Sequence, residues 1–149
     1  MKIHLINPPS PGDYPFIREG RCMQKEGVWT TVWPPISLAT IGAVLREHGF
    51  DVKINDCPSE RIRIGGLKEI LRDYRPDLLI INTATPSILH DLTIPHIAKE
   101  TLPGIKTAVF GIHVGTLPED SFETAGGAFD YFYHTETECI GLVRSHTPQ

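Results

Sequence analysis

The sequence predicts an α/β domain of the doubly wound kind, in which five parallel strands form a sheet covered by helices on both faces. Two observations carry this expectation. Five short apolar segments alternate with segments whose apolar residues recur at the helical period, which is the pattern of βαβ units. One of them, Asp77–Asn82, is a continuous apolar run, as in strands buried on both sides. For five strands the natural arrangement is the flavodoxin-like or Rossmann-like three-layer sandwich with strand order 2-1-3-4-5.

Each expected element follows from its apolar spacing and from the residues that punctuate it. Pro8 and Pro9 stop the first strand, and Pro35 stands at or just before the first turn of the first helix. Gly49 ends that helix, and Pro95 must kink the third helix or open its second half. The expected strands are Lys2–Asn7, Phe50–Asp56, Asp77–Asn82, Ile105–Gly111 and Phe129–His134. The expected helices are Ile36–His48, Gly66–Tyr74, Ile88–Leu102 and Glu119–Ala125, with a loop at Ile112–Pro118.

The composition fits a single globular domain over residues 1–149, because 40% of the residues are hydrophobic and 21% are charged. The net charge of −4 comes without a basic stripe, which argues against nucleic acid as a partner. No apolar run approaches the roughly 20 residues that span a bilayer, and the N-terminus lacks a signal-peptide pattern. Three cysteines, Cys22, Cys57 and Cys139, show no CxxC spacing. This cysteine usage suits a reducing compartment, so we expect a cytoplasmic protein.

The predicted topology directs attention to the loops that follow the strands. Ligands of open α/β sheets bind outside the carboxyl ends of the strands, at the switch point between the first and third strands. The longest loop, Asn7–Pro35, and the hydroxyl-rich Thr83–Ser87 fall at this point, and Gly111–Thr116 lies next in line. A connection as long as the first of these is usually functional or disordered. The sequence therefore predicts a ligand site at this edge of the sheet.

The residues of these loops each have a structural alternative. The hydroxyls of Thr83, Thr85 and Ser87 can hydrogen-bond a ligand, but Ser87 can also serve only as the N-cap of the next helix. Gly111 and Gly115 permit close approach of a flat or bulky ligand, or they simply satisfy turn geometry. The pattern of the loops alone does not decide between these roles.

The remaining chemistry-bearing residues form no arrangement of nucleophile and base, and no catalytic or metal-ligating residue is predicted. His113 is the one histidine in a predicted site loop, and a structural or solvent-facing role is favoured for it. Cys22, within the mixed-charge stretch Arg18–Gln24, fits a silent thiol better than a reactive one. Trp29 and Trp33 either shield a ligand or anchor the long loop.

Several familiar ligand-binding patterns are absent from the sequence. It contains neither GxGxxG after the first strand nor a GxxxxGK[ST] P-loop. A receiver domain needs acidic residues after the first and third strands, where this chain has Asn7 and Asn82. A flavodoxin-like module for a nucleotide or flavin is disfavoured because Pro8 and Pro9 offer no amide donors. A protein-interaction module whose long loop binds a partner stays open as an alternative.

Five stretches of the chain form an ordered set that covers it from about Lys2 to Glu138. They are INPP (Ile6–Pro9), REGRCMQ (Arg18–Gln24), WPPISLATIGAVLREHGFDVKINDC (Trp33–Cys57), PDLLIINTATPS (Pro76–Ser87) and VFGIHVGTLPED (Val109–Asp120). This set resembles the N-terminal cobalamin-binding domain of cobalamin-dependent radical SAM enzymes.

The resemblance implies that the corrin ring of cobalamin lies over the carboxyl ends of the strands and that its nucleotide tail enters near strand one. It implies cofactor contacts from the loops already singled out. The residues are Asn7, Pro8, Pro9, Ser10, Thr83, Thr85, Ser87, Gly111, His113, Gly115 and Thr116. It also implies a C-terminal radical SAM domain in the same full-length protein, which would hold an iron–sulfur cluster and S-adenosylmethionine and be the partner of this domain.

Two parts of the family pattern are missing. The DxHxxG motif that supplies a cobalt-ligating histidine in many cobalamin domains is replaced by NPPSPG (Asn7–Gly12), so we expect no protein histidine below the cobalt. The CxxxCxxC motif that holds the iron–sulfur cluster is absent, and Cys139 stands alone. We therefore expect this chain by itself to be non-catalytic, either as a fragment of a longer enzyme or as a binding module.

Overall fold

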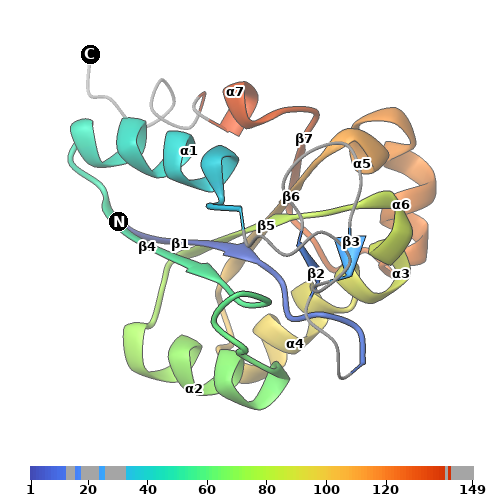
Figure 1. Ribbon diagram of the computed structural model, residues 1–149, viewed down its shortest axis with the longest axis horizontal. Coiled ribbons are helices and arrows are strands. Elements are labelled where there is room, and N and C mark those ends of the chain that lie inside the picture. Colours follow the sequence, from blue (N-terminus) through green and yellow to red (C-terminus); the bar gives the residue numbers. More distant parts are fainter. Residues whose placement is uncertain (13–15, 18–23, 26–32, 140, 142–149) are drawn as a thin grey trace.

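The computed structural model describes residues 1–12, 16–17, 24–25, 33–139 and 141 (Figure 1). The strands are β1 (Lys2–Asn7), β2 (Phe16–Ile17), β3 (Gln24–Lys25), β4 (Asp51–Asp56), β5 (Leu78–Asn82), β6 (Lys106–Phe110) and β7 (Tyr131–Tyr133). The helices are α1 (Ile36–Glu47), α2 (Ile64–Tyr74), a 3-10 turn at Thr85–Ser87, α3 (Ile88–Asp91), α4 (Ile94–Thr101), α5 (Ile112–Thr116), α6 (Pro118–Thr124) and α7 (Glu136–Cys139). None of the helices in these ranges is long and apolar enough to cross a membrane.

Five strands form one parallel sheet in the order β4-β1-β5-β6-β7. Counted along the main sheet, this order is 2-1-3-4-5, which confirms the predicted doubly wound topology. The switch point lies where β1 is flanked by β4 and β5. The long connection after β1 is not wholly irregular as expected, because β2 and β3 within it pair in antiparallel fashion.

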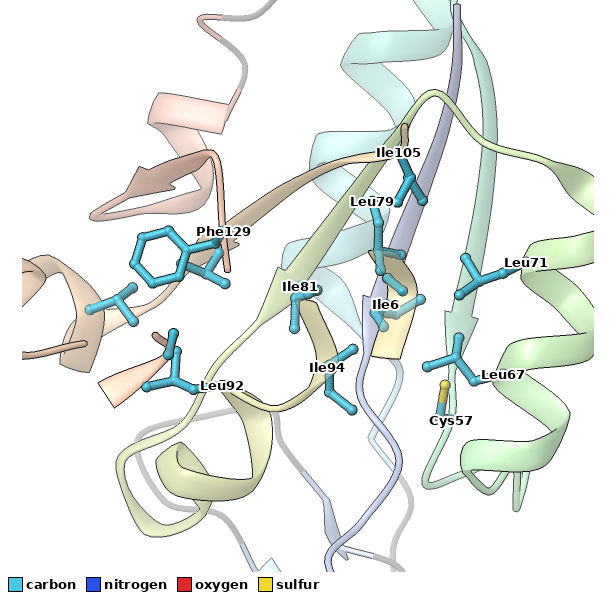
Figure 2. Close-up of a cluster of buried hydrophobic side chains, with 14 residues drawn as sticks. Ile6, Cys57, Leu67, Leu71, Leu79, Ile81, Leu92, Ile94, Ile105 and Phe129 are labelled. Atoms are coloured by element: carbon cyan, nitrogen blue, oxygen red, sulfur yellow. The ribbon is translucent and has the colours of Figure 1, made fainter. Parts of the chain in front are cut away.

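Helices cover both faces of the sheet and separate the core into two clusters. On one face α1 buries Leu38, Ile41 and Leu45, three residues at helical spacing, with Cys139 of α7 in the same cluster. On the other face α2 and α4 pack over side chains such as Ile6 of β1 (Figure 2). Along β5 the side chains alternate between the clusters, with Leu79 and Ile81 in one and Leu78 and Ile80 in the other, which is why this strand reads as a continuous apolar run.

The predicted helix Ile88–Leu102 is two helices in the structure, as Pro95 required. α3 ends at Asp91, α4 begins at Ile94, and the proline lies in the first turn of α4, where its missing N–H breaks no helical hydrogen bond. The expectation of a loop at Ile112–Pro118 is wrong, because Ile112–Thr116 forms α5. Glycine suggested a turn there, yet the amide of Gly115 donates to the carbonyl of Gly111 at 3.0 Å as in a helix.

Candidate functional site

The last residues of the five parallel strands form a row across the carboxyl edge of the sheet. The register pairs Asn7 with Asp56, Asn82 with Phe110, and Phe110 with Tyr133. A hydrogen bond of 2.8 Å between Asn82 and Asn7 joins the two halves of the row. Because laterally paired side chains point to the same face of a sheet, the row lies on the face that α1 covers. One half of this edge is therefore polar and the other half aromatic.

The polar half is a continuous chain of hydrogen bonds. The Asn82 amide Nδ2 donates to Asn7 Oδ1, and Asn7 Nδ2 donates to Asp56 Oδ1 at 3.1 Å. The second oxygen of Asp56 accepts a short hydrogen bond from the Ser59 hydroxyl, and its backbone amide donates to Glu60 Oε1 at 2.7 Å. Asn7 is 1% exposed, whereas Asp56 and Asn82 are half-buried, so this set of hydrogen bonds is buried at its middle and reaches solvent at both ends.

The aromatic half is less accessible to solvent at Phe110 than at Tyr133. Phe110 is buried, and Tyr133 is half-buried. Burial raises the pKa of the Tyr133 hydroxyl to about 12, with the nearby Cys139 and Tyr131 acting in the same direction. The phenol therefore stays neutral at physiological pH, and this half of the row adds no charge to the edge.

Thr83, the first residue whose hydroxyl was predicted to bind a ligand, connects the loop after β5 to the end of β6. Both the amide and the hydroxyl of Thr83 donate to the carbonyl oxygen of Phe110 at 2.8 Å. Gly111 follows with a φ of +135°, and a Cβ there would lie 2.5 Å from the Thr83 carbonyl oxygen. Only glycine combines this dihedral angle with this approach. Thr83 and Gly111 thus set the shape of the edge, and the Thr83 hydroxyl is already occupied.

The hydroxyl of Ser87, another of the three predicted hydroxyls, is occupied as well. Ser87 stands at the N-cap position of α3 but makes no capping hydrogen bond, so the capping interpretation is wrong in its chemistry. Its hydroxyl donates instead to Asp91 Oδ2 at 2.8 Å, and the Ala84 amide donates to the same oxygen at 3.0 Å. Asp91, which sequence reasoning missed, organises this loop from the following helix. Thr85 is exposed, and its hydroxyl makes no hydrogen bond to the described part of the chain.

The third segment of the predicted site, Gly111–Thr116, contains helix α5. One of its polar side chains, that of His113, is available for a ligand. The Thr116 hydroxyl donates back to the Ile112 carbonyl at 2.7 Å. A Cβ on Gly115 would lie 2.7 Å from Nδ1 of His134, so this glycine permits close packing against β7. His113 is half-exposed, and its ring has no hydrogen bond within the described residues.

The loop after β1 is held by a histidine distant in sequence. Pro8 and Pro9 are buried and Ser10 is half-buried. The carbonyl oxygen of Pro9 accepts a hydrogen bond of 2.9 Å from His90 Nε2. Sequence reasoning missed His90, because no local signal connects a helix residue to a loop 81 positions earlier.

Large apolar side chains are exposed at or near the first residues of the helices that begin at this edge of the sheet. Trp33 precedes α1 and Ile36 starts it, and these residues are 58% and 57% exposed. Leu89 of α3 is 73% exposed, and Ile112, which starts α5, is 75% exposed. Single exposed apolar residues are ordinary, but four at the starts of helices on one edge suit a large ligand with apolar surface.

The carboxylates of this edge, Asp56 and Asp91, are engaged in hydrogen bonds with neighbouring residues. No group of three or more His, Cys, Asp or Glu side chains in residues 1–12, 16–17, 24–25, 33–139 and 141 is placed to hold a metal ion. The expectations for Arg18–Gln24, Cys22 and Trp29 fall outside the described residues, apart from Gln24 in β3.

A doubly wound parallel sheet with such an edge defines a ligand-binding α/β domain. Residues 27–141 match the family model of the B12 binding domain. The chain therefore belongs to the B12-binding domain family, whose cofactor is cobalamin. The match confirms the family to which the ordered stretches of sequence pointed.

Individual relatives agree with this assignment. The chain is 33% identical over 120 residues to an uncharacterized methyltransferase, PH0819, of Pyrococcus horikoshii. The matched residues make up 80% of this chain and 23% of that protein. The solved structure of the radical S-adenosylmethionine methyltransferase TsrM from Kitasatospora setae, with cobalamin and a [4Fe-4S] cluster bound, superposes with a TM-score of 0.65. Its identity is 18%, over 96% of this chain and 26% of TsrM. This chain thus spans about a quarter of the length of either relative.

The fold is also shared outside this family. A CheY-like protein (tadZ) from Pseudomonas aeruginosa PAO1 gives a TM-score of 0.59 at 12% identity, over 100% of this chain and 98% of that one. Similarity at this level shows a common fold and nothing about the ligand.

Proposed function

We propose that this chain is the cobalamin-binding part of a cobalamin-dependent radical SAM enzyme, and that the full-length protein transfers methyl groups or performs related radical chemistry. The family assignment, the similarity to a protein named as a methyltransferase, and the fold shared with TsrM support this proposal. The iron–sulfur cluster and S-adenosylmethionine belong, in this proposal, to a C-terminal radical SAM domain that partners this one.

The residues of the carboxyl edge fit cobalamin. The corrin is a broad ring with apolar faces and a rim of uncharged amide side chains. The exposed Trp33, Ile36, Leu89 and Ile112 offer apolar area, and burying it contributes about 25 cal/mol for each Å². The half-buried Asn82 and the exposed Thr85 offer hydrogen-bonding groups without charge. This combination of apolar surface with neutral polar groups is the observation that carries the proposal.

When bound, cobalamin supplies a cobalt centre that carries a methyl group. The chain's own residues bind and orient the cofactor. Thr85 and His113 have polar atoms available for it, and the rigid Pro8 and Pro9 shape the loop beneath it. The other predicted residues keep the loops in position, as the Thr83 hydrogen bonds to Phe110 and the Ser87 hydrogen bond to Asp91 do. No residue of this chain is proposed to be catalytic.

Titration with hydroxocobalamin followed by ultraviolet–visible absorption tests the proposal. We expect a stoichiometric spectral change, and we expect Ile112→Glu to weaken binding because it places a charge on the apolar surface. Ala43→Glu is a matched control, since it adds the same charge to an exposed position further along α1. A spectrum identical to that of free ligand at protein excess, with circular dichroism showing a folded chain, overturns the proposal.

A further inference from the structure

In the hydrogen bonds that link Asn82, Asn7 and Asp56, each amide donates its NH₂ toward Asp56. We infer that Asp56, acting through Asn7, fixes the amide of Asn82 so that it presents its carbonyl oxygen to an amide side chain of the corrin. Asn82 is then a specificity-determining contact, and Asp56 is a positioning residue. This inference rests on the proposed function, because it concerns the same site.

The direction starts at the carboxylate. An ionised Asp56 has only acceptor oxygens, so the group that Asn7 turns toward Asp56 Oδ1 must be its NH₂, at 3.1 Å. The other carboxylate oxygen is held by the Ser59 hydroxyl, and Glu60 Oε1 accepts from the Asp56 backbone amide. Two side chains therefore hold the carboxylate, Asn7 at Oδ1 and Ser59 at Oδ2.

Asn7 passes this direction to the next strand. With its NH₂ committed to Asp56, only Oδ1 remains for Asn82, and it accepts from Asn82 Nδ2 at 2.8 Å. Asn7 is 1% exposed, so water cannot replace either partner, and reversing its amide would leave two buried mismatches. The orientation of the Asn82 amide is thus decided two strands away.

At the Asn82 end of this set of hydrogen bonds, the group left for a ligand is an acceptor, the carbonyl oxygen Oδ1. Asn82 is the last residue of β5, at the centre of the sheet, and it is half-buried. Its Oδ1 makes no hydrogen bond to the described residues and is not a buried unpaired atom, so it is open to solvent. This oxygen accepts an N–H of a primary amide, and it repels a carboxylate in the same position. Cobalamin carries primary amides around its ring, and hydrolysis of one amide gives a corrin monocarboxylate of nearly the same shape.

Binding of cobalamin and of its separate monocarboxylates tests this inference. We expect the wild-type chain to bind at least one monocarboxylate about tenfold more weakly than cobalamin, because one hydrogen bond is replaced by repulsion between acceptors. Asn82→Leu should bind cobalamin about fivefold more weakly and lose this discrimination. Asp56→Asn frees the amides to reverse and should reduce the discrimination while Asn82 is still present. Asp73→Asn, which removes a charge from the exposed surface of α2, is the matched control.

A second measurement requires no cofactor. The chain has three asparagines, Asn7, Asn55 and Asn82, so selective ¹⁵N-asparagine labelling gives three side-chain NH₂ signals. Each aspartate-to-asparagine variant adds a fourth NH₂ signal; among the three original signals, Asp56→Asn should shift those of both Asn7 and Asn82, whereas the control Asp73→Asn should shift neither.

The outcomes separate the two proposals. A wild-type chain that binds no corrinoid overturns the proposed function and this inference together. A chain that binds cobalamin and all its monocarboxylates equally, or an Asn82→Leu variant that still discriminates, overturns the inference alone. An Asn82 signal unmoved by Asp56→Asn overturns the positioning role of Asp56.

Discussion

Acidification should destabilise this protein through one buried histidine in the central sheet. His4 lies in β1, is fully buried, and donates from Nε2 to Asn55 Oδ1 at 2.8 Å. Asn55 is held in this orientation because its own NH₂ donates to Glu60. The other ring nitrogen, Nδ1, has no partner within the described residues, so a proton placed there would be buried without an acceptor.

The size of this loss of stability follows from the pKa of His4. Burial lowers this pKa from 6.5 to about 4, the hydrogen bond to Asn55 opposes the shift, and the charge of Lys53 adds to it. Below pH 6.5 the unfolded chain takes up a proton that the folded chain refuses until about pH 4. Stability therefore falls as the pH drops through this window and levels off below it. A shift of this size corresponds to about 3 kcal/mol of lost unfolding free energy.

Urea denaturation at a series of pH values between 7 and 4 measures this loss. Other groups also titrate in this range, so the quantity of interest is the difference in pH dependence between the wild type and His4→Leu, which cannot titrate. His48→Gln is the matched control, because His48 is exposed at the end of α1. The control should retain the full wild-type pH dependence, whatever its absolute stability.

This reasoning is refuted if the free energy of unfolding depends on pH equally in the wild type and in His4→Leu. If the leucine variant does not fold, proton NMR of the wild type decides the question directly. A His4 ring that titrates near pH 6 in the folded chain contradicts the proposed cost of charging Nδ1.

Three further outcomes are expected. Gly111→Ala should lower the free energy of unfolding by about 2 kcal/mol, because of its φ of +135° and the 2.5 Å approach to the Thr83 carbonyl, and an unchanged melting temperature contradicts this. Burial alone would raise the pKa of Asp130, but hydrogen bonds from a β6 amide and two lysines lower it to about 2. Asp130→Asn should therefore be less stable than the wild type at pH 7, and the difference should shrink as the pH falls from about 4 toward 2; equal chemical-denaturation midpoints at pH 7 contradict it. Paramagnetic resonance of the cobalt(II) complex should show no nitrogen splitting from a protein histidine, because NPPSPG (Asn7–Gly12) replaces the DxHxxG motif, and a one-nitrogen splitting that is lost in His113→Ala would prove this wrong.

The strand order could be predicted from the sequence, and with it the edge on which the candidate site is proposed. The segment Lys2–Asn7 was predicted to its exact bounds, and helix α1 to within one residue at its end. These features are local, because apolar periodicity and proline or glycine punctuation depend on neighbours within a few positions. The topology and the rule for ligands of open sheets then selected the carboxyl edge.

The chemistry of that edge was decided by the tertiary structure. Asp56, Asn7 and Asn82 meet only because β1 pairs with β4 and β5 in one register. His90 reaches Pro9 across 81 positions, and the Thr83 hydroxyl is taken by a carbonyl of the next strand. A hydrogen bond depends on distance and angle to a partner, and strand pairing fixes that partner through contacts distant in the chain. Periodicity along the sequence carries no information about those partners, so it could point to this edge as a candidate site but could not say which of its polar groups remain available.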